Sequence, residues 1–200
     1  MGTDPAEETT TRRRRLPLSL RERVSLLYEG RRAAVLGEPV AAMRRAGLDP
    51  VVDERHRFAH SRFGAPVTIE VGFVSSFRIF GALIDTVWTG KDEAARGTAA
   101  VLGYRLGRHA RFLPSTRSAR AREWADELNA DGSLCQLINR AELKEVRLEE
   151  GPRGRIVQLQ PLAGTITAVY FPPLPPYTVA VRPSEADAQL ELLTRLLPRA

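Results

Sequence analysis

Alternating apolar and polar residues predict four short strands in the last third of the chain. A period of two is typical of strands that bury one face. The four runs are Leu143–Glu149, Arg155–Gln160, Thr165–Phe171 and Tyr177–Arg182. Glycine-containing stretches at 151–154 and 161–164 predict turns, and the proline-rich stretch 172–176 predicts a stiff connector between the last two strands.

A helical period follows these strands. Leu190, Leu193 and Leu197 share one stripe, which indicates an amphipathic helix. Ser184 is the expected N-cap, and Asp187 lies three residues on, where its carboxylate can accept from free N–H groups of the first turn. The pattern therefore predicts an antiparallel sheet with this C-terminal helix packed over one face.

The period of two also occurs between residues 67 and 88. The run Val67–Phe73 predicts a half-buried strand, and Ser75 and Ser76 predict a turn. The next run, Phe77–Trp88, is apolar on both faces and predicts a longer strand. With the C-terminal runs this gives about six strands, and most connections are too short for parallel crossovers. The expected sheet is mainly antiparallel, either open or strongly curved.

Helical patterns occupy the remaining segments. A capped helix that ends at Gly37 and a shorter one, Pro39–Ala46, form an expected N-terminal pair. Residues 51–66 show no clear period. A helix is expected over Asp92–Phe112 and another over Thr116–Leu128. Leu134, Leu137, Ile138 and Ala141 mark a further short helix. The predicted fold class is α+β, with the helices packed on one face of the sheet.

The expected domain organisation is simple. Residues 1–15 are polar and basic and predict a disordered tail, whereas residues 16–200 form one α+β domain with a helical extension over 16–50. The most apolar stretch contains Glu70, Arg78 and Asp85, so no membrane span is expected.

Composition narrows the class of protein. The chain has 200 residues, 43% of them hydrophobic, a net charge of +6 and one cysteine, Cys135. A single cysteine excludes a disulfide framework within the chain. Only two of the 30 basic residues are lysine, a bias typical of a GC-rich bacterial genome. We therefore expect a soluble bacterial protein of the cytoplasm.

Few residues suggest catalytic chemistry. An enzyme would have to use His56, His60, His109, Asp85 or Cys135, and no catalytic set is assigned from the sequence. The spacing of His56 and His60 would suit a metal on a helix, but neighbouring arginines disfavour a bound cation. Glycine-rich phosphate loops are absent. No metal site and no cofactor are predicted, and enzymatic activity of unknown class stays the third hypothesis.

An arginine-rich segment supports a second hypothesis, nucleic-acid binding. No acidic residue interrupts it, and part of it falls on the helix expected over Asp92–Phe112. Few aromatic residues accompany the arginines, so a solvated basic surface is the simpler interpretation. The segment contains Arg105, Arg108, Arg111, Arg117, Arg120 and Arg122.

The leading hypothesis is a non-enzymatic binding or scaffold domain. A long strand that is apolar on both faces requires something to cover it. The partner would be an apolar small molecule in a cleft or another protein, a second copy of this chain included. The expected cleft residues are Phe73, Arg78, Phe80, Asp85, Trp88 and Tyr170.

Overall fold

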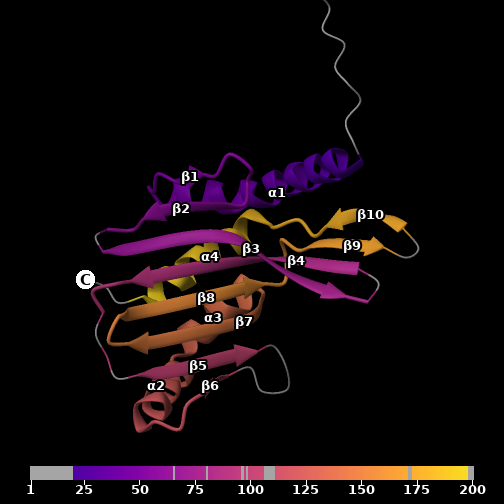
Figure 1. Cartoon of the computed structure of the whole chain (residues 1–200). Helices are drawn as coiled ribbons and strands as arrows, with labels where there is room; N and C mark the ends of the chain where they lie inside the picture. Colours follow the sequence, from indigo (N-terminus) through magenta and orange to yellow (C-terminus); the bar gives the residue numbers. More distant parts are fainter. Residues whose placement is uncertain are drawn as a thin grey trace, which may run out of the picture.

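A computed structural model describes residues 20–64, 66–79, 81–95, 97, 99–105, 111–170 and 173–197. The fold is α+β, with four helices and one antiparallel sheet of ten strands among these residues (Figure 1). The sheet is not strongly curled. The expectation of about six strands was too low, because the sheet has ten, and the strongly curved alternative was wrong. The predicted tail at 1–15 lies outside the described residues.

The sheet has one main path and one side branch. Its order is β1-β2-β3-β4-β8-β7-β5-β6, and β9, which also pairs with β4, is followed by β10. The strands are β1 (Val51–Val52), β2 (Phe58–Arg62), β3 (Val67–Arg78), β4 (Gly81–Asp92), β5 (Ala100–Arg105), β6 (Phe112–Pro114), β7 (Leu143–Gly151), β8 (Gly154–Pro161), β9 (Ile166–Tyr170) and β10 (Pro173–Thr178).

The expected N-terminal helical pair is a single helix, α1 (Leu20–Arg45), which continues through Pro39. A proline inside a helix removes one backbone hydrogen bond. Here the buried residues Leu36, Val40 and Met43 form one stripe that spans the proline. Burial of this stripe against the rest of the core offsets the lost bond, so Gly37 does not end the helix.

The helix expected over Asp92–Phe112 is wrong. Its described part contains β5, in which the buried residues Ala100, Leu102 and Tyr104 alternate with more exposed ones. This is a period of two. The expected helix also included residues 106–110, which lie outside the described part of the chain. Residues 51–66, expected to be irregular, contain β1 and β2.

The serine turn expected at Ser75 and Ser76 is also wrong. These residues lie inside β3, which pairs with β4 without a break from Val67–Asp92 to Arg78–Gly81. The chain reverses only beyond Arg78. Serine is compatible with a strand, and the continuous ladder with β4 outweighs its turn preference. One hairpin of two 12-residue strands replaces the two shorter units expected.

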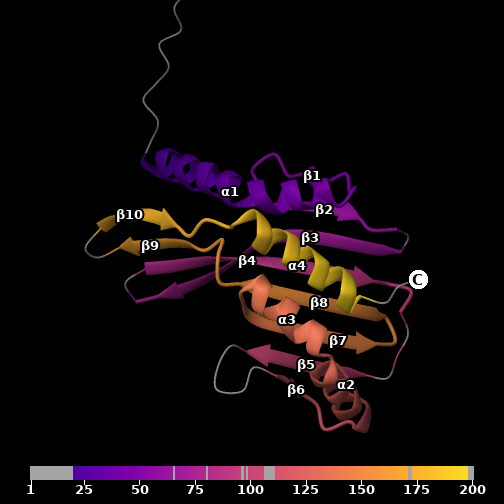
Figure 2. The ribbon, with the colours of Figure 1, turned by 180° about the vertical axis from the view of Figure 1, so that it is seen from behind.

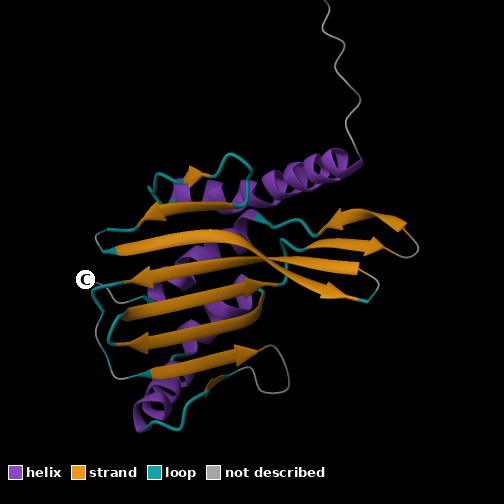
Figure 3. Cartoon of the chain, viewed as in Figure 1, coloured by secondary structure: helices purple, strands orange, loops and turns teal. Residues whose placement is uncertain are grey.

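The three later helices follow the sequence pattern closely. They are α2 (Ala119–Ala130), α3 (Gly132–Ala141) and α4 (Pro183–Leu196). Seen from behind, the helices lie over one face of the sheet, and the opposite face carries none of them (Figures 2 and 3). The core between these two layers contains Leu190, Leu193 and Leu197, as predicted.

The start of α4 differs from the prediction. Arg182, rather than Ser184, is the N-cap, and Pro183 occupies the first helical position. The fixed φ of proline suits this position, where a missing N–H costs nothing. The buried Glu185 accepts from the Arg182 backbone N–H at 3.1 Å and also pairs with the Arg182 side chain. Glu185 therefore makes the carboxylate contact that was expected of Asp187.

Candidate interaction surface

The β3–β4 hairpin extends beyond the main sheet and forms a projection with β9 and β10 (Figure 1). We call this projection the wing and define it as residues 73–84 and 166–178. The strand order across it is β3-β4-β9-β10, with β9 pairing to Gly81–Ile84 of β4. Arg78 is the only charged residue in these two ranges. The wing is therefore an almost neutral structure on a chain of net charge +6.

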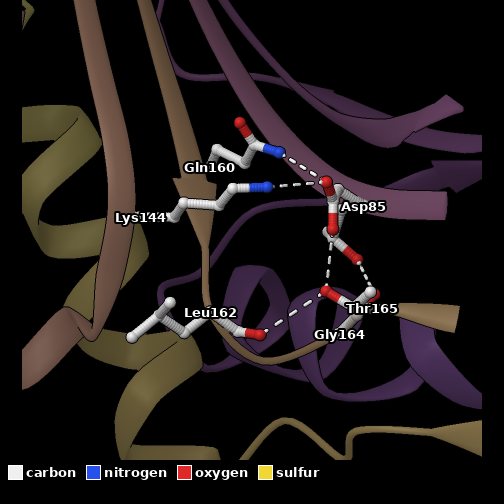
Figure 4. A network of polar contacts seen from close by, with 7 residues as sticks. Asp85, Lys144, Gln160, Leu162, Gly164 and Thr165 are labelled. Carbon is white, nitrogen blue, oxygen red and sulfur yellow. Dashed lines mark hydrogen bonds and ion pairs between the residues drawn. The ribbon is translucent and has the colours of Figure 1, made fainter. Parts of the chain in front are cut away.

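A buried carboxylate holds the wing to the main sheet (Figure 4). Asp85 of β4 is 6% exposed. Its Oδ2 accepts from Gln160 Nε2 at 2.7 Å and Lys144 Nζ at 3.1 Å, and its Oδ1 accepts from Thr165 Oγ1 at 2.9 Å. A buried charge is tolerated when it is paired and hydrogen-bonded. These contacts fix the start of β7, the end of β8 and the residue just before β9 against β4.

A second contact fixes the same connection. Thr86 Oγ1 donates to the Gly164 carbonyl at 2.6 Å, and this contact is buried. Gly164 has φ +79°, and a Cβ atom there would lie 2.6 Å from Thr86 Oγ1. Only glycine fits both the left-handed backbone and this close approach. The β8–β9 connection is thereby held in one position, which in turn positions β9.

The first helix covers one face of the wing. Val35 of α1 packs in a small apolar cluster with Ile84 and Ile166. Arg31 Nη1 also donates to Thr178 Oγ1 of β10 at 3.1 Å. Through these contacts α1 bridges the hairpin and the branch strands. The projection is therefore braced from α1 and from the Asp85 network.

Apolar side chains are concentrated at the surface of this braced projection. Ile79 is 92% exposed and Phe77 is 76% exposed. The described exposed large apolar residues in or next to the wing are Val74, Phe77, Ile79, Tyr177 and Val179. Scattered single exposures are ordinary, but a contiguous apolar patch indicates an interaction site. Five of the nine exposed large apolar residues of the described surface lie in or next to the wing, more than on any other part of it.

The outer edge of β3 is uncovered along the wing. β2 pairs with β3 only over Thr68–Gly72. From Phe73 to Arg78, the described pairing partner of β3 is β4 alone, and no strand lies beyond it in Figure 3. An exposed edge presents unpaired N–H and C=O groups that can pair with another strand.

The direction of those groups follows from the neighbouring pairing. The Val67 carbonyl accepts from Phe63 N–H at 2.9 Å, so Val67 points its backbone groups toward the outer edge. Backbone groups alternate between the two sides along a strand. Because the β3–β4 register is unbroken, Ser75 and Phe77 also point their N–H and C=O groups outward. Val74 and Ser76 point theirs toward β4.

The other outer strands are protected against such pairing. β10 contains Pro173, Pro175 and Pro176, which donate no hydrogen bonds. β1 has two residues and β6 has three. Short edges and prolines are the usual protection against edge-to-edge association. The wing end of β3 has neither, and Val71–Phe77 contains no charged residue.

The residues expected to line an apolar cleft do not share one environment. Trp88 is fully buried, and its Nε1 donates to Gln189 Oε1 on α4 at 2.9 Å. Asp85 lies three residues earlier on β4 and so faces the opposite side of the sheet. Phe73 is half-buried, 5.9 Å beneath the Arg32 guanidinium. Phe80 and the side chains of Arg78 and Tyr170 lie outside the described part.

The arginine segment does not lie on one helix. Arg105 belongs to β5, Arg111 precedes β6, and Arg117 precedes α2. Arg120 lies on α2 within 3.5 Å of Glu127, and Arg122 is exposed on the same helix. The list of expected arginines also includes Arg108, which is outside the described residues. Only the shared helix face expected of Arg105, Arg108 and Arg111 depended on the wrong helix assignment.

The candidate catalytic residues are placed on separate elements. His56 lies in the turn before β2 with φ +52°, His60 lies on β2, and Cys135 lies on α3. His109 is outside the described residues. Within the described part, no group of three or more His, Cys, Asp or Glu side chains could hold a metal ion. Asp85 already accepts from three donors.

Several cavities remain among the described residues, including a wide one of about 680 Å³ lined by Phe63, Glu191, Thr194 and Arg195. One of about 70 Å³ lies beside Cys135 and Tyr104, where burial, with a smaller contribution from Cys135, raises the pKa of the Tyr104 phenol. A groove of about 300 Å³ lies between α1 and α4 next to Phe63, with Arg45 and Asp187 paired across it at 2.7 Å. None of these three brings two of the candidate catalytic residues together.

Comparison with protein-family models, curated proteins and solved structures finds no match to this chain. The helices in the described ranges are all too short or too polar to cross a membrane. The wing and the open edge of β3 are therefore the features from which a function can be inferred. Part of the sequence signal for them was present: the uncharged run Val71–Phe77 leads directly into Phe77–Trp88, the run that is apolar on both faces.

Proposed function

We propose that this chain is a non-enzymatic protein-binding domain. It binds by adding a strand of the partner to the open edge of β3. The observation that carries the proposal is the outward backbone of Ser75 and Phe77, flanked by the exposed side chains of Val74 and Ile79. In strand addition, main-chain hydrogen bonds supply affinity and neighbouring side chains supply specificity.

The charge of the wing favours a protein over a membrane surface or a nucleic acid. Arg78 is the only charged residue in its two ranges, so attraction to anionic lipids or phosphates would be weak there. Unpaired backbone groups are also costly in lipid, whereas another strand satisfies them. A neutral, extended polypeptide segment fits this edge best.

Site-specific photo-crosslinking in cells tests the proposal. A photoreactive phenylalanine analogue replaces Phe77 in the full chain, and the control carries it at Leu113, which is 49% exposed on β6. We expect a discrete protein adduct at position 77 only. Ser75→Pro should abolish the adduct, because it removes an outward N–H while leaving the β4 ladder intact. Equal labelling at both positions, or labelled lipid instead of protein, would contradict the proposal.

A further inference from the structure

We infer that the strand added to β3 is β3 of a second copy of this chain. The two strands would run antiparallel about a two-fold axis that passes beside Ser76. This inference rests on the proposed function, since it names the partner of the same edge. It is carried by the length, the hydrogen-bonding pattern and the charge of the uncovered segment.

The length of the open edge suits a copy of itself. β2 covers β3 up to Gly72. A Cβ atom added to Gly72 would lie 3.5 Å from the Arg57 carbonyl oxygen, so the 53–57 turn packs closely against this point. The hairpin turn beyond Arg78 limits the other end. An incoming strand therefore has room over Val74–Arg78. A long strand from another protein would meet the 53–57 turn. The tip of a second β3–β4 hairpin is as short as the open segment and would not.

The midpoint of Val74–Arg78 is Ser76, and this fixes the register. With Ser76 opposite Ser76 of the second copy, Ser75 lies opposite its Phe77, and the reverse pair follows by symmetry. Both residues point their backbone groups outward, so the two pairs would exchange about four hydrogen bonds. Side chains that face each other also lie on the same face of the joined sheet, as an antiparallel pair requires.

Charge and symmetry are compatible with this pairing. Arg78 would lie opposite Val74 of the second copy, so the two arginines are separated by four residues along the strands. That is roughly 13 Å, beyond the Debye length of about 8 Å at physiological ionic strength. The contact is also closed, because each copy uses the one long unprotected edge found among its described strands, and closed contacts do not propagate into fibres.

Cysteine crosslinking tests the register. Ser76→Cys in a Cys135→Ser background would place two thiols across a non-hydrogen-bonded pair, with Cα atoms about 4.5 Å apart, within the range for a disulfide. The matched control Ser75→Cys would hold its thiols apart, with Cα atoms roughly 8 Å distant. Ser133→Cys on α3 controls for random collision. We expect at least ten times more disulfide dimer from Ser76→Cys than from either control.

The outcomes separate the two proposals. Sedimentation of the wild-type chain should show a concentration-dependent dimer, reduced at least tenfold by Phe77→Glu, an exposed change that spares the fold. A monomer at all concentrations, or Ser75→Cys as the main crosslinked form, overturns the second-copy pairing. If the photo-crosslink at position 77 then captures a different protein through β3, strand addition stands and only the second copy is wrong. If it captures no protein, both are wrong.

Discussion

Asp85 shows how a single buried residue positions the surface on which function depends. Donors from β7, from β8 and from the connection before β9 converge on its carboxylate, and none of them lies near it in sequence. A charged residue in an apolar strand was expected to need a partner, but the sequence could not show that Lys144, Gln160 and Thr165 supply it. Such convergence depends on strand register, which the local pattern does not encode.

Replacement of Asp85 should therefore destabilise the fold. Asp85→Ala removes the acceptor shared by three part-buried donors, and we expect a loss of about 1–2 kcal/mol in the free energy of unfolding, since water can reach the Lys144 side chain, which is 48% exposed. Urea denaturation with an unchanged m-value measures it. Glu70→Ala, an exposed carboxylate on β3, is the control. Equal stability of the two variants would contradict the role assigned to Asp85.

The contacts of Gln189 lead to a second prediction at the residue scale. It accepts from Trp88 Nε1 at 2.9 Å and donates to the Ala141 carbonyl at 3.1 Å, within the core. Gln189→Ala leaves both groups unsatisfied, so we expect a loss of about 2 kcal/mol in thermal or urea unfolding. Gln136→Ala, on the exposed face of α3, should change stability by less than about 0.5 kcal/mol. A loss of the same size at Gln136 would refute this account.

At the scale of elements, local patterns predicted what local interactions determine. The α2 and α3 helices, β7, β8, β9 and the stripe of α4 were recovered because capping, periodicity and short turns decide them. The errors occurred where tertiary pairing decides. β5 was taken for a helix, although Gly103 disfavours one, and α1 was divided at Pro39, although its buried stripe continues.

The candidate site was predictable only in outline. Apolar character on both faces of the Phe77–Trp88 run indicated a segment that needs cover. That Phe77 lies on an open edge while Trp88 is fully buried follows from where β2 ends and α4 packs. The end of the β2–β3 pairing and the packing of α4 on Trp88 are both set by contacts between residues far apart in sequence. The run identified from the sequence therefore reaches the open edge only at Phe77 and Arg78, and most of it forms β4.

The turn that limits the open edge should be sensitive to acid. Asp53 accepts from the backbone N–H groups of Arg55 and Arg57 and pairs with the Arg57 guanidinium at 3.0 Å. This pairing lowers the pKa of Asp53 well below its ordinary value of 3.8. Because the pKa is lower in the folded state, the stabilisation is present above pH 3.8 and is lost as the pH falls toward the folded-state pKa.

Thermal unfolding as a function of pH measures this contribution. Asp53→Asn should lower the Tm at pH 7, and its difference from the wild type should shrink as the pH falls below about 4. Glu54→Gln, on an exposed neighbour, should show no such pH-dependent difference. A difference that stays constant down to pH 2 would show that the charge of Asp53 does not stabilise the turn.

At the scale of the whole molecule, the central claim is that the wing end of β3 pairs with another strand. Residue-resolved amide hydrogen exchange tests it most directly, at low and at high protein concentration. The Val74 and Ser76 amides should be protected at both, because they face β4. The Ser75 and Phe77 amides should exchange rapidly when dilute and gain at least tenfold protection when concentrated. If these two amides stay unprotected at every concentration and in cell extract, the edge is not a binding surface.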